Sequence, residues 1–238
     1  MAYKTAEEQQ SIMVKMVRPL LLLTTQPIVQ VMCLYMAFIY GVMYLMLATF
    51  PDLWTRRYGE PLDLAGLNYI SLGLGFAIGT QICAPANDRI YRFFKQNGHE
   101  GLPEFRLPLL FLGSILVPGG LVLYGWTAQK HLYWIVPNVG AFMYAIGNMI
   151  CFLCVQTYVI DTYSKSNFAA SALATLAFTR SLGGFAFPVF VAPYMFGALD
   201  YGWGCSVLAF VAAGVGLIAP LSMWLYGAKL RSKSSYAR

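Results

Sequence analysis

One charged residue lies deep within a long apolar stretch and is the strongest candidate for a functional group. Arg180 falls in the apolar run Phe168–Leu199, about 5 Å along a helix from the middle of the run. A guanidinium at that depth costs roughly 2.5–3.5 kcal/mol to insert, so it should face a bundle interior or a wet cavity. Arg180 is therefore either a cation on a substrate path or gate, or a structural residue bonded to neighbouring carbonyl or hydroxyl groups. No acidic residue lies comparably deep, because Asp88 and Asp161 end other apolar runs.

Polar and aromatic residues at helical spacing could line a cavity around this cation. Tyr40 and Tyr44 are one turn apart in one apolar run. Tyr144 and Asn148 are one turn apart in another, and Gln81 interrupts a third. The candidates for a substrate path are therefore Arg180, Tyr40, Tyr44, Gln81, Tyr144 and Asn148. The alternative for each is an interhelical hydrogen bond or an aromatic contact at the membrane interface.

The residue types that membrane enzymes need are missing from the apolar runs. The two histidines, His99 and His131, fall between the runs, and no pair of deep aspartates exists for an aspartyl mechanism. Cys151 and Cys154 have the spacing of a redox or zinc motif, but they sit in mid-run without a second ligand pair. We therefore expect no catalytic residue, no metal site, no cofactor and no enzyme activity.

The composition predicts an integral membrane protein. Of the 238 residues, 58% are hydrophobic and only 11% are charged, and the mean hydropathy is +0.60. Soluble domains carry roughly 25% charged residues, and disordered chains have low hydrophobicity, so both classes are excluded. The net charge of +6 fits basic loops beside membrane spans. Because no basic cluster lies on a polar background, we expect membrane lipid and not nucleic acid as a partner.

Six apolar runs are long enough to cross the bilayer as helices, which takes about 20 residues each. They are Ile28–Phe50, Leu64–Ala86, Leu107–Trp126, Leu132–Ile160, Phe168–Leu199 and Tyr201–Tyr226. A lipid-exposed backbone must satisfy its own hydrogen bonds, so an all-α bundle of six transmembrane helices is predicted for residues 28–226. Residues 1–27 are expected to form a cytoplasmic tail with an interfacial helix, and residues 227–238 a basic cytoplasmic tail.

The positive charges predict which side of the membrane the loops face. With these spans, twelve Lys and Arg residues fall on the side of both termini. Only three, Arg56, Arg57 and Lys130, fall on the other side. Basic loops remain in the cytoplasm, so both termini are predicted to be cytoplasmic.

Several spans contain residues that permit close packing or bending. Gly75-x-x-x-Gly79 in the second span allows another helix to approach closely. Pro188 in the fifth span leaves the carbonyl of Gly184 without its helical donor and is expected to kink that helix. Broken helices of this kind are common in transporters.

Two longer blocks have a recognisable pattern. The first runs from Asn87-Asp88-Arg89 to Pro103-Glu104-Phe105-Arg106-Leu107-Pro108. The second contains Tyr158, Asp161 and Tyr163, followed by Gly184 and Pro188. The first resembles the cytoplasmic loop between spans eight and nine of major facilitator superfamily transporters, and the second resembles spans ten and eleven. The similarity is greatest to the fungal drug:proton antiporter-like group, and it covers only the C-terminal six-span half.

The resemblance implies a secondary transporter in the plasma membrane that exports a hydrophobic or cationic small molecule or secondary metabolite, with proton coupling implied by the family alone. The substrate path in this superfamily runs between two six-span halves, so a second half is expected as partner, either another copy or a separate chain. An inactive or interaction-only fragment is the alternative. Asp88, Arg89, Glu104 and Arg106 are predicted to form a cytoplasmic latch that holds one access state. The alternative for these four residues is charge that only sets topology.

Overall fold

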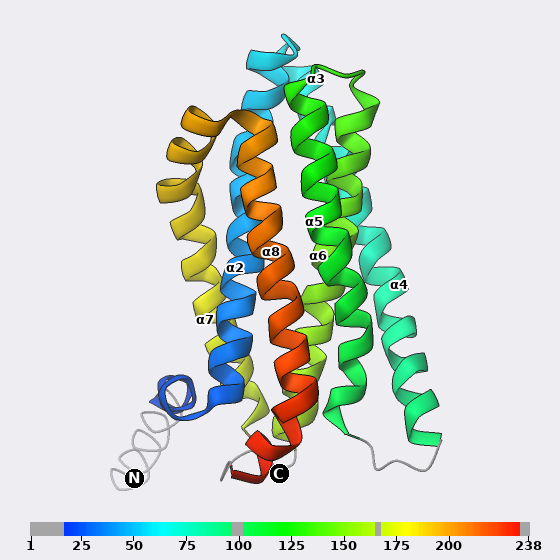
Figure 1. Cartoon of the computed structure of the whole chain (residues 1–238), viewed down its shortest axis with the longest axis vertical. Coiled ribbons are helices and arrows are strands. Elements are labelled where there is room, and N and C mark those ends of the chain that lie inside the picture. The colour runs from blue at the N-terminus through cyan, green and yellow to red at the C-terminus, as the bar shows by residue number, and fades with distance from the viewer. Residues whose placement is uncertain (1–16, 97–101, 165–167, 234–238) are drawn as a thin grey trace, which may run out of the picture.

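The computed structural model describes residues 17–96, 102–164 and 168–233, and every element in these ranges is helical (Figure 1). A helical stretch at 17–25 leads into the first long helix. The elements that follow are α2 (Pro27–Asp52), η1 (Leu53–Arg57), α3 (Leu62–Leu67), α4 (Tyr69–Gln96), η2 (Pro103–Arg106), α5 (Leu107–Gln129), α6 (Ile135–Tyr163), α7 (Ala169–Ala186), η4 (Phe187–Val191) and α8 (Ala192–Lys233). The predicted all-α class is confirmed.

Five helical segments of the described chain are long and apolar enough to cross a membrane. They are Pro27–Arg57, Leu62–Lys95, Pro103–Gln129, Ile135–Tyr163 and Ala169–Gly227. The last has 59 residues, more than enough for two crossings of about 20 residues each. Its helix is interrupted at Asp200, where φ is 56° and ψ is 179°. The chain reverses direction there (Figure 1), so this segment supplies both the fifth and the sixth predicted spans.

The two ends of the described chain lie at the same end of the bundle. The helical stretch at 17–25, the last turns of α8, the end of α4 and the start of α5 all lie there (Figure 1). At the opposite end are η1, α3 and the reversal at Asp200. This arrangement agrees with an even number of crossings, while the cytoplasmic assignment of the first end stays a prediction from loop charge. The predicted basic tail begins as helix, because α8 continues to Lys233.

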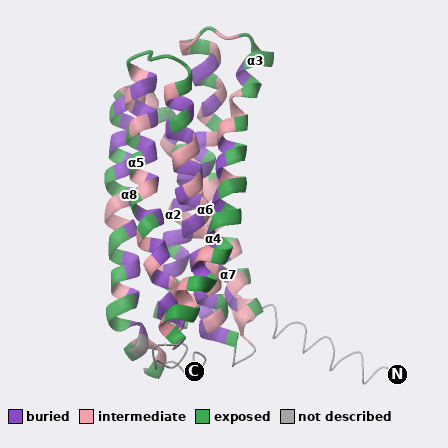
Figure 2. Cartoon of the chain, turned by 90° about the vertical axis from the view of Figure 1, so that its right-hand side faces the viewer, coloured by how far each residue is buried: buried purple, intermediate pink, exposed green. Residues whose placement is uncertain are grey.

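The bundle packs around α6, which contacts α2, α4, α5 and α7. Gly75 and Gly79 allow α4 to lie directly on α6, as their spacing predicted. A Cβ atom on Gly75 would come within 2.6 Å of the Ala145 side chain, and one on Gly79 within 3.1 Å of the Ile146 backbone. The outward face of α4 remains uncovered (Figure 2). In the most apolar stretch of this segment, only 28% of the residues are buried, whereas 50% or more are buried in the other four segments. The α4 helix therefore lies at an edge of the bundle.

At Pro188, where the sequence predicted a kink, the helix changes from α-helical to π-helical hydrogen bonding. The α-helical hydrogen bonding of α7 ends at Ala186, and η4 is a π-helical turn that contains Pro188. A π turn is one of the ways in which a helix accommodates a missing backbone donor. It separates α7, which packs on α2, from the first turns of α8, which lead to Asp200.

Candidate functional site

Arg180 lies where α2, α6 and α7 meet. Its Nη1 donates a hydrogen bond of 3.1 Å to the Tyr40 hydroxyl on α2. Its Cζ lies 4.8 Å from the ring centroid of Tyr40 and 5.2 Å from that of Phe152 on α6. All three side chains are half-buried. The cation is therefore held between two aromatic rings in favourable cation–π geometry. We call Arg180, Tyr40, Tyr44 and Phe152 the Arg180 cluster.

The guanidinium of Arg180 has no carboxylate partner within the described chain. The ion pairs found there involve Arg56, Arg57, Arg106 and Arg231. Within these residues its hydrogen bond goes to a hydroxyl and none goes to a backbone carbonyl. Since a guanidinium has five N–H donors, most of its donor capacity is open to another molecule.

The Arg180 cluster continues toward the end of the bundle that holds Asp200. On α7, the positions that follow Arg180 at one-turn intervals are Gly184 and Pro188. On α2, Tyr44 follows Tyr40 at the same interval, and their rings are 6.0 Å apart. The small size of Gly184 matters, because a Cβ atom there would come within 2.8 Å of the Tyr44 ring. These two helix faces therefore run alongside one another.

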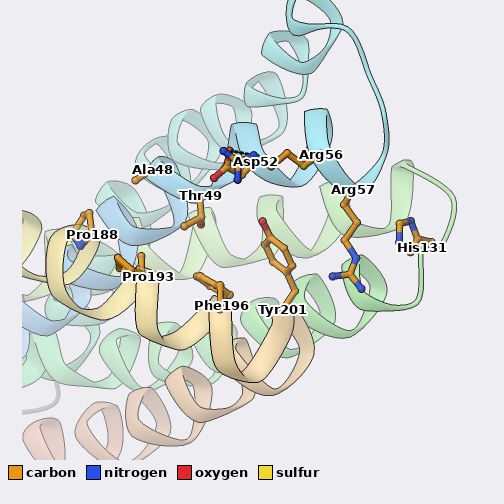
Figure 3. Close-up of a pocket in the computed structure, with 12 residues that line it drawn as sticks. Ala48, Thr49, Asp52, Arg56, Arg57, His131, Pro188, Pro193, Phe196 and Tyr201 are labelled. Atoms are coloured by element: carbon orange, nitrogen blue, oxygen red, sulfur yellow. Dashed lines mark ion pairs between the residues drawn. The ribbon is translucent and has the colours of Figure 1, made fainter.

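Beyond Pro188 the two faces diverge around a cavity of about 770 Å³ (Figure 3). We call it the outer cavity. Its lining residues are Ala48, Thr49, Asp52, Arg56, Arg57, His131, Pro188, Ala192, Pro193, Phe196, Gly197 and Tyr201. Its volume is within the range of about 300–1,000 Å³ that is typical of small-molecule sites.

The arginines of the outer cavity already have carboxylate partners. Arg56 pairs with Asp52 at 3.2 Å on the adjoining turn. Arg57 pairs with both carboxylate oxygens of Asp200, and it also donates a hydrogen bond of 3.1 Å to the carbonyl of Gln129. Arg57 thereby ties the end of the first span to the end of α5 and to the reversal at Asp200. This clamp was not predicted, because nothing in the sequence links positions 143 residues apart.

The other candidates for the substrate path form no hydrogen bond with the Arg180 cluster within the described structure. Tyr144 and Asn148 are fully buried inside the bundle. Asn148 Nδ2 donates to the Tyr144 hydroxyl at 3.2 Å and to the Ile39 carbonyl at 3.4 Å, so the pair bonds α6 to α2. Gln81 is exposed on α4. Phe152, one turn beyond Asn148, is the α6 residue that reaches Arg180, and it was not singled out from sequence because its helix has apolar residues on every side.

A second polar cluster occupies the opposite end of the bundle and centres on Arg106. Its side chain is only 12% exposed, and it donates from Nε to Asp161 at 2.9 Å and from Nη1 to Asp88 at 2.6 Å. Its Cζ also lies 4.5 Å from the ring centroid of Tyr91. Arg106 therefore joins η2 to α4 and α6.

Glu104 forms an ion pair with a residue outside the four that were predicted as a latch. It is buried, and its Oε2 accepts a hydrogen bond of 2.8 Å from Arg231 near the end of α8. Arg89 is exposed, and no ion pair of the described residues includes it. The four predicted latch residues are thus divided, since Asp88 and Arg106 pair together and Glu104 pairs with Arg231.

The remaining motif residues have structural positions near this cluster. Tyr158 is fully buried and donates to the sulfur of Met223 on α8 at 3.9 Å. Tyr163 is likewise buried at the end of α6. The described residues contain no group of three or more His, Cys, Asp or Glu placed to hold a metal ion.

Comparison with known proteins shows which transporters this chain resembles. A protein of Penicillium aethiopicum named "Efflux pump vrtL" is 45% identical over 238 residues, which is 98% of this chain and 46% of that protein. "MFS-type transporter oryF" of Aspergillus oryzae is 44% identical over 91% of this chain and 45% of its own length. "Probable efflux pump mfs2" of Aspergillus flavus is 40% identical over 92% of this chain and 52% of its own length.

This chain matches one half of a major facilitator superfamily transporter. It spans about half the length of the curated relatives that it matches. No family model matches the chain, and no solved structure matches it. The matched major facilitator proteins are named as transporters and pumps and not as enzymes. The chain is accordingly a multi-pass membrane protein that is similar to one half of these transporters.

Proposed function

We propose that this chain forms one half of an efflux transporter and that the Arg180 cluster is its contribution to the substrate path. The observation that carries the proposal is a half-buried cation in the membrane-spanning part of α7 with an aromatic cage and no carboxylate partner in the described chain. A cation in that position is costly unless it meets water, a ligand or a partner charge.

A second six-span unit would close this path. Arg180, Tyr40 and Phe152 are only half-buried, Tyr44 is exposed, and most residues in the apolar stretch of α4 are not buried. In transporters built of two parallel halves, the substrate lies between the halves and access alternates as they rock against each other. The second half is either another copy of this chain or a separate six-span unit. An inactive or interaction-only role is the competing account, and it predicts no transport in any combination.

The proposed substrate is a hydrophobic small molecule such as a secondary metabolite. The names of the relatives as efflux pumps support this direction of transport. We propose the plasma membrane as the location and the cytoplasm as the site of both termini, because the Arg106 end carries most of the positive loop charge. Proton coupling is proposed from the family alone.

The Arg106 and Glu104 ion pairs are proposed to act as a latch within this half. They join η2 to α4, α6 and α8, so the cytoplasmic helix ends would move as one body when the half rocks. Arg89 is exposed beside them and is free to meet a charge on the second half. The alternative, charge that only sets topology, predicts that neutralising Arg106 changes orientation without changing transport.

An efflux assay with and without a second half tests the proposal. Yeast lacking its own drug pumps would express this chain alone, or together with the other half of the vrtL relative. We expect retention of a fluorescent aromatic compound to fall when both halves are present. Efflux by this chain alone would identify a self-associating transporter. Unchanged retention in both strains, with the chain folded in the membrane, would contradict the transport role.

A further inference from the structure

The cations along the α2–α7 face differ in whether they are neutralised. In the outer cavity, Arg56 and Arg57 have Asp52 and Asp200 as partners. Arg180, deeper in the bundle, has only a neutral hydroxyl and two rings. The single uncompensated positive charge on this face is therefore at the Arg180 cluster, as far as the described residues go.

The chemistry of that position selects the charge of a ligand. A carboxylate or similar oxyanion can accept two parallel N–H donors from a guanidinium, and such charge-assisted bonds are about twice as strong as neutral ones. An organic cation would meet a like charge in a low-dielectric site, where repulsion is strongest. The rings of Tyr40, Tyr44 and Phe152 would pack against an aromatic or other flat apolar body.

We propose that the ligand of the Arg180 cluster is a small organic anion, with a carboxylate or other oxyanion group on an aromatic or apolar body. This inference rests on the proposed function, since it names the substrate class of the same path. Arg180 binds the anionic group, and the aromatic residues bind the body. It reverses the cationic preference that the family resemblance allowed.

The outer cavity fits the release of such an anion. It lies beyond Pro188 on the α2 and α7 faces that also carry the Arg180 cluster, and it is large enough for a small molecule. Its arginines are already paired, so they attract an anion less strongly than Arg180 does. A ligand that moves outward along this face therefore passes from a stronger to a weaker site.

Equilibrium binding to the full chain in lipid nanodiscs tests the charge preference. Three tritiated compounds share one ring system and differ in charge: 2-naphthylacetate, 2-naphthylacetamide and 2-(2-naphthyl)ethylammonium. We expect the anion to bind at least about tenfold more tightly than the amide, and the cation to bind more weakly than both. Arg180→Gln should lower the affinity for the anion to that for the amide and leave the amide unchanged.

Matched variants make the outcome decisive. Arg92→Gln makes the same charge change at an exposed position of α4 and should leave all three affinities unaltered. Arg180→Lys keeps the positive charge but lacks the planar set of guanidinium donors, so it should retain part of the preference for the anion over the amide. This variant serves as the test if Arg180→Gln does not fold. Equal binding of the three compounds, or an anion preference that survives Arg180→Gln, would overturn the inference while leaving the binding face intact. Binding of none of them to the folded wild-type chain would overturn the binding face itself.

Discussion

Replacing Arg106 by glutamine should destabilise the bundle by about 3 kcal/mol. The hydrogen bond to Asp161 is 2.9 Å long and joins side chains that are 12% and 29% exposed, so its loss should cost roughly 1.5–3 kcal/mol. Asp88 is 55% exposed, so the loss of its ion pair with Arg106 should cost no more than about 1 kcal/mol. The contact with the Tyr91 ring adds roughly 0.5–1 kcal/mol. Together these contributions amount to roughly 2–5 kcal/mol, which includes the range of about 3–5 kcal/mol for breaking a buried pair.

Reversible unfolding in mixed detergent micelles, followed by the loss of helical circular dichroism as dodecyl sulfate is added, would measure this free energy. A double-mutant cycle with Asp161→Asn isolates the interaction between Arg106 and Asp161, and it should give a coupling free energy of about 1–2 kcal/mol. Arg89→Gln is the control, since Arg89 is exposed at the same end of α4, and it should change stability by less than about 0.5 kcal/mol. A coupling free energy near zero would refute the view that Arg106 joins α4 to α6.

Three further predictions follow from packing, topology and assembly. Gly183→Ala places a Cβ against the Ala37 carbonyl and should cost about 1–3 kcal/mol in the same unfolding assay, whereas Gly73→Ala has nothing within 4 Å and should be neutral or stabilising. A membrane-impermeant thiol reagent should label Tyr133→Cys and Ser232→Cys from opposite sides of the membrane. The five native cysteines are buried, so they should not react. Labelling of both introduced cysteines from one side would contradict the even-crossing topology. Crosslinking in native membranes should capture a dimer or a heteromer, and a strictly monomeric chain contradicts the two-half model.

The sequence predicted the helices well because each one carries its own signal. A transmembrane helix satisfies its backbone internally, so an apolar run of sufficient length identifies it without any neighbour. The bend at Pro188 and the close approach at Gly75 and Gly79 were predictable for the same reason, since proline and glycine act through the local backbone. The reversal at Asp200 falls on the single residue between the last two predicted spans.

The partners of the polar residues could not be predicted, because they depend on how helices rotate against one another. Asp88, Arg89, Glu104 and Arg106 were predicted as one latch without assigned partners; Arg106 pairs with Asp88 and Asp161, while Glu104 pairs with Arg231. Tyr144 and Asn148 have the same helical spacing as Tyr40 and Tyr44, but they face the bundle interior. Spacing along a helix shows which residues share a face, and only packing shows what that face meets.

Efflux per folded molecule of Arg180→Leu tests the central claim most directly. The substitution removes a deep charge that costs roughly 2.5–3.5 kcal/mol to insert, and the described residues show no backbone carbonyl bonded to Arg180 that would be left unpaired. Abundance in the membrane should therefore hold or rise. Arg180→Lys should lower efflux in part, because it keeps a positive charge but loses the planar, paired N–H donors of the guanidinium.

The measurement compares membrane abundance with export of an aromatic compound in cells that supply a complementary second half. The account predicts that Arg180→Leu is present at wild-type abundance or above and exports almost nothing per molecule. Reduced abundance with unchanged export per molecule would leave Arg180 only a structural role. Unchanged export per molecule at normal abundance would contradict the account, because the substrate path would then not include Arg180.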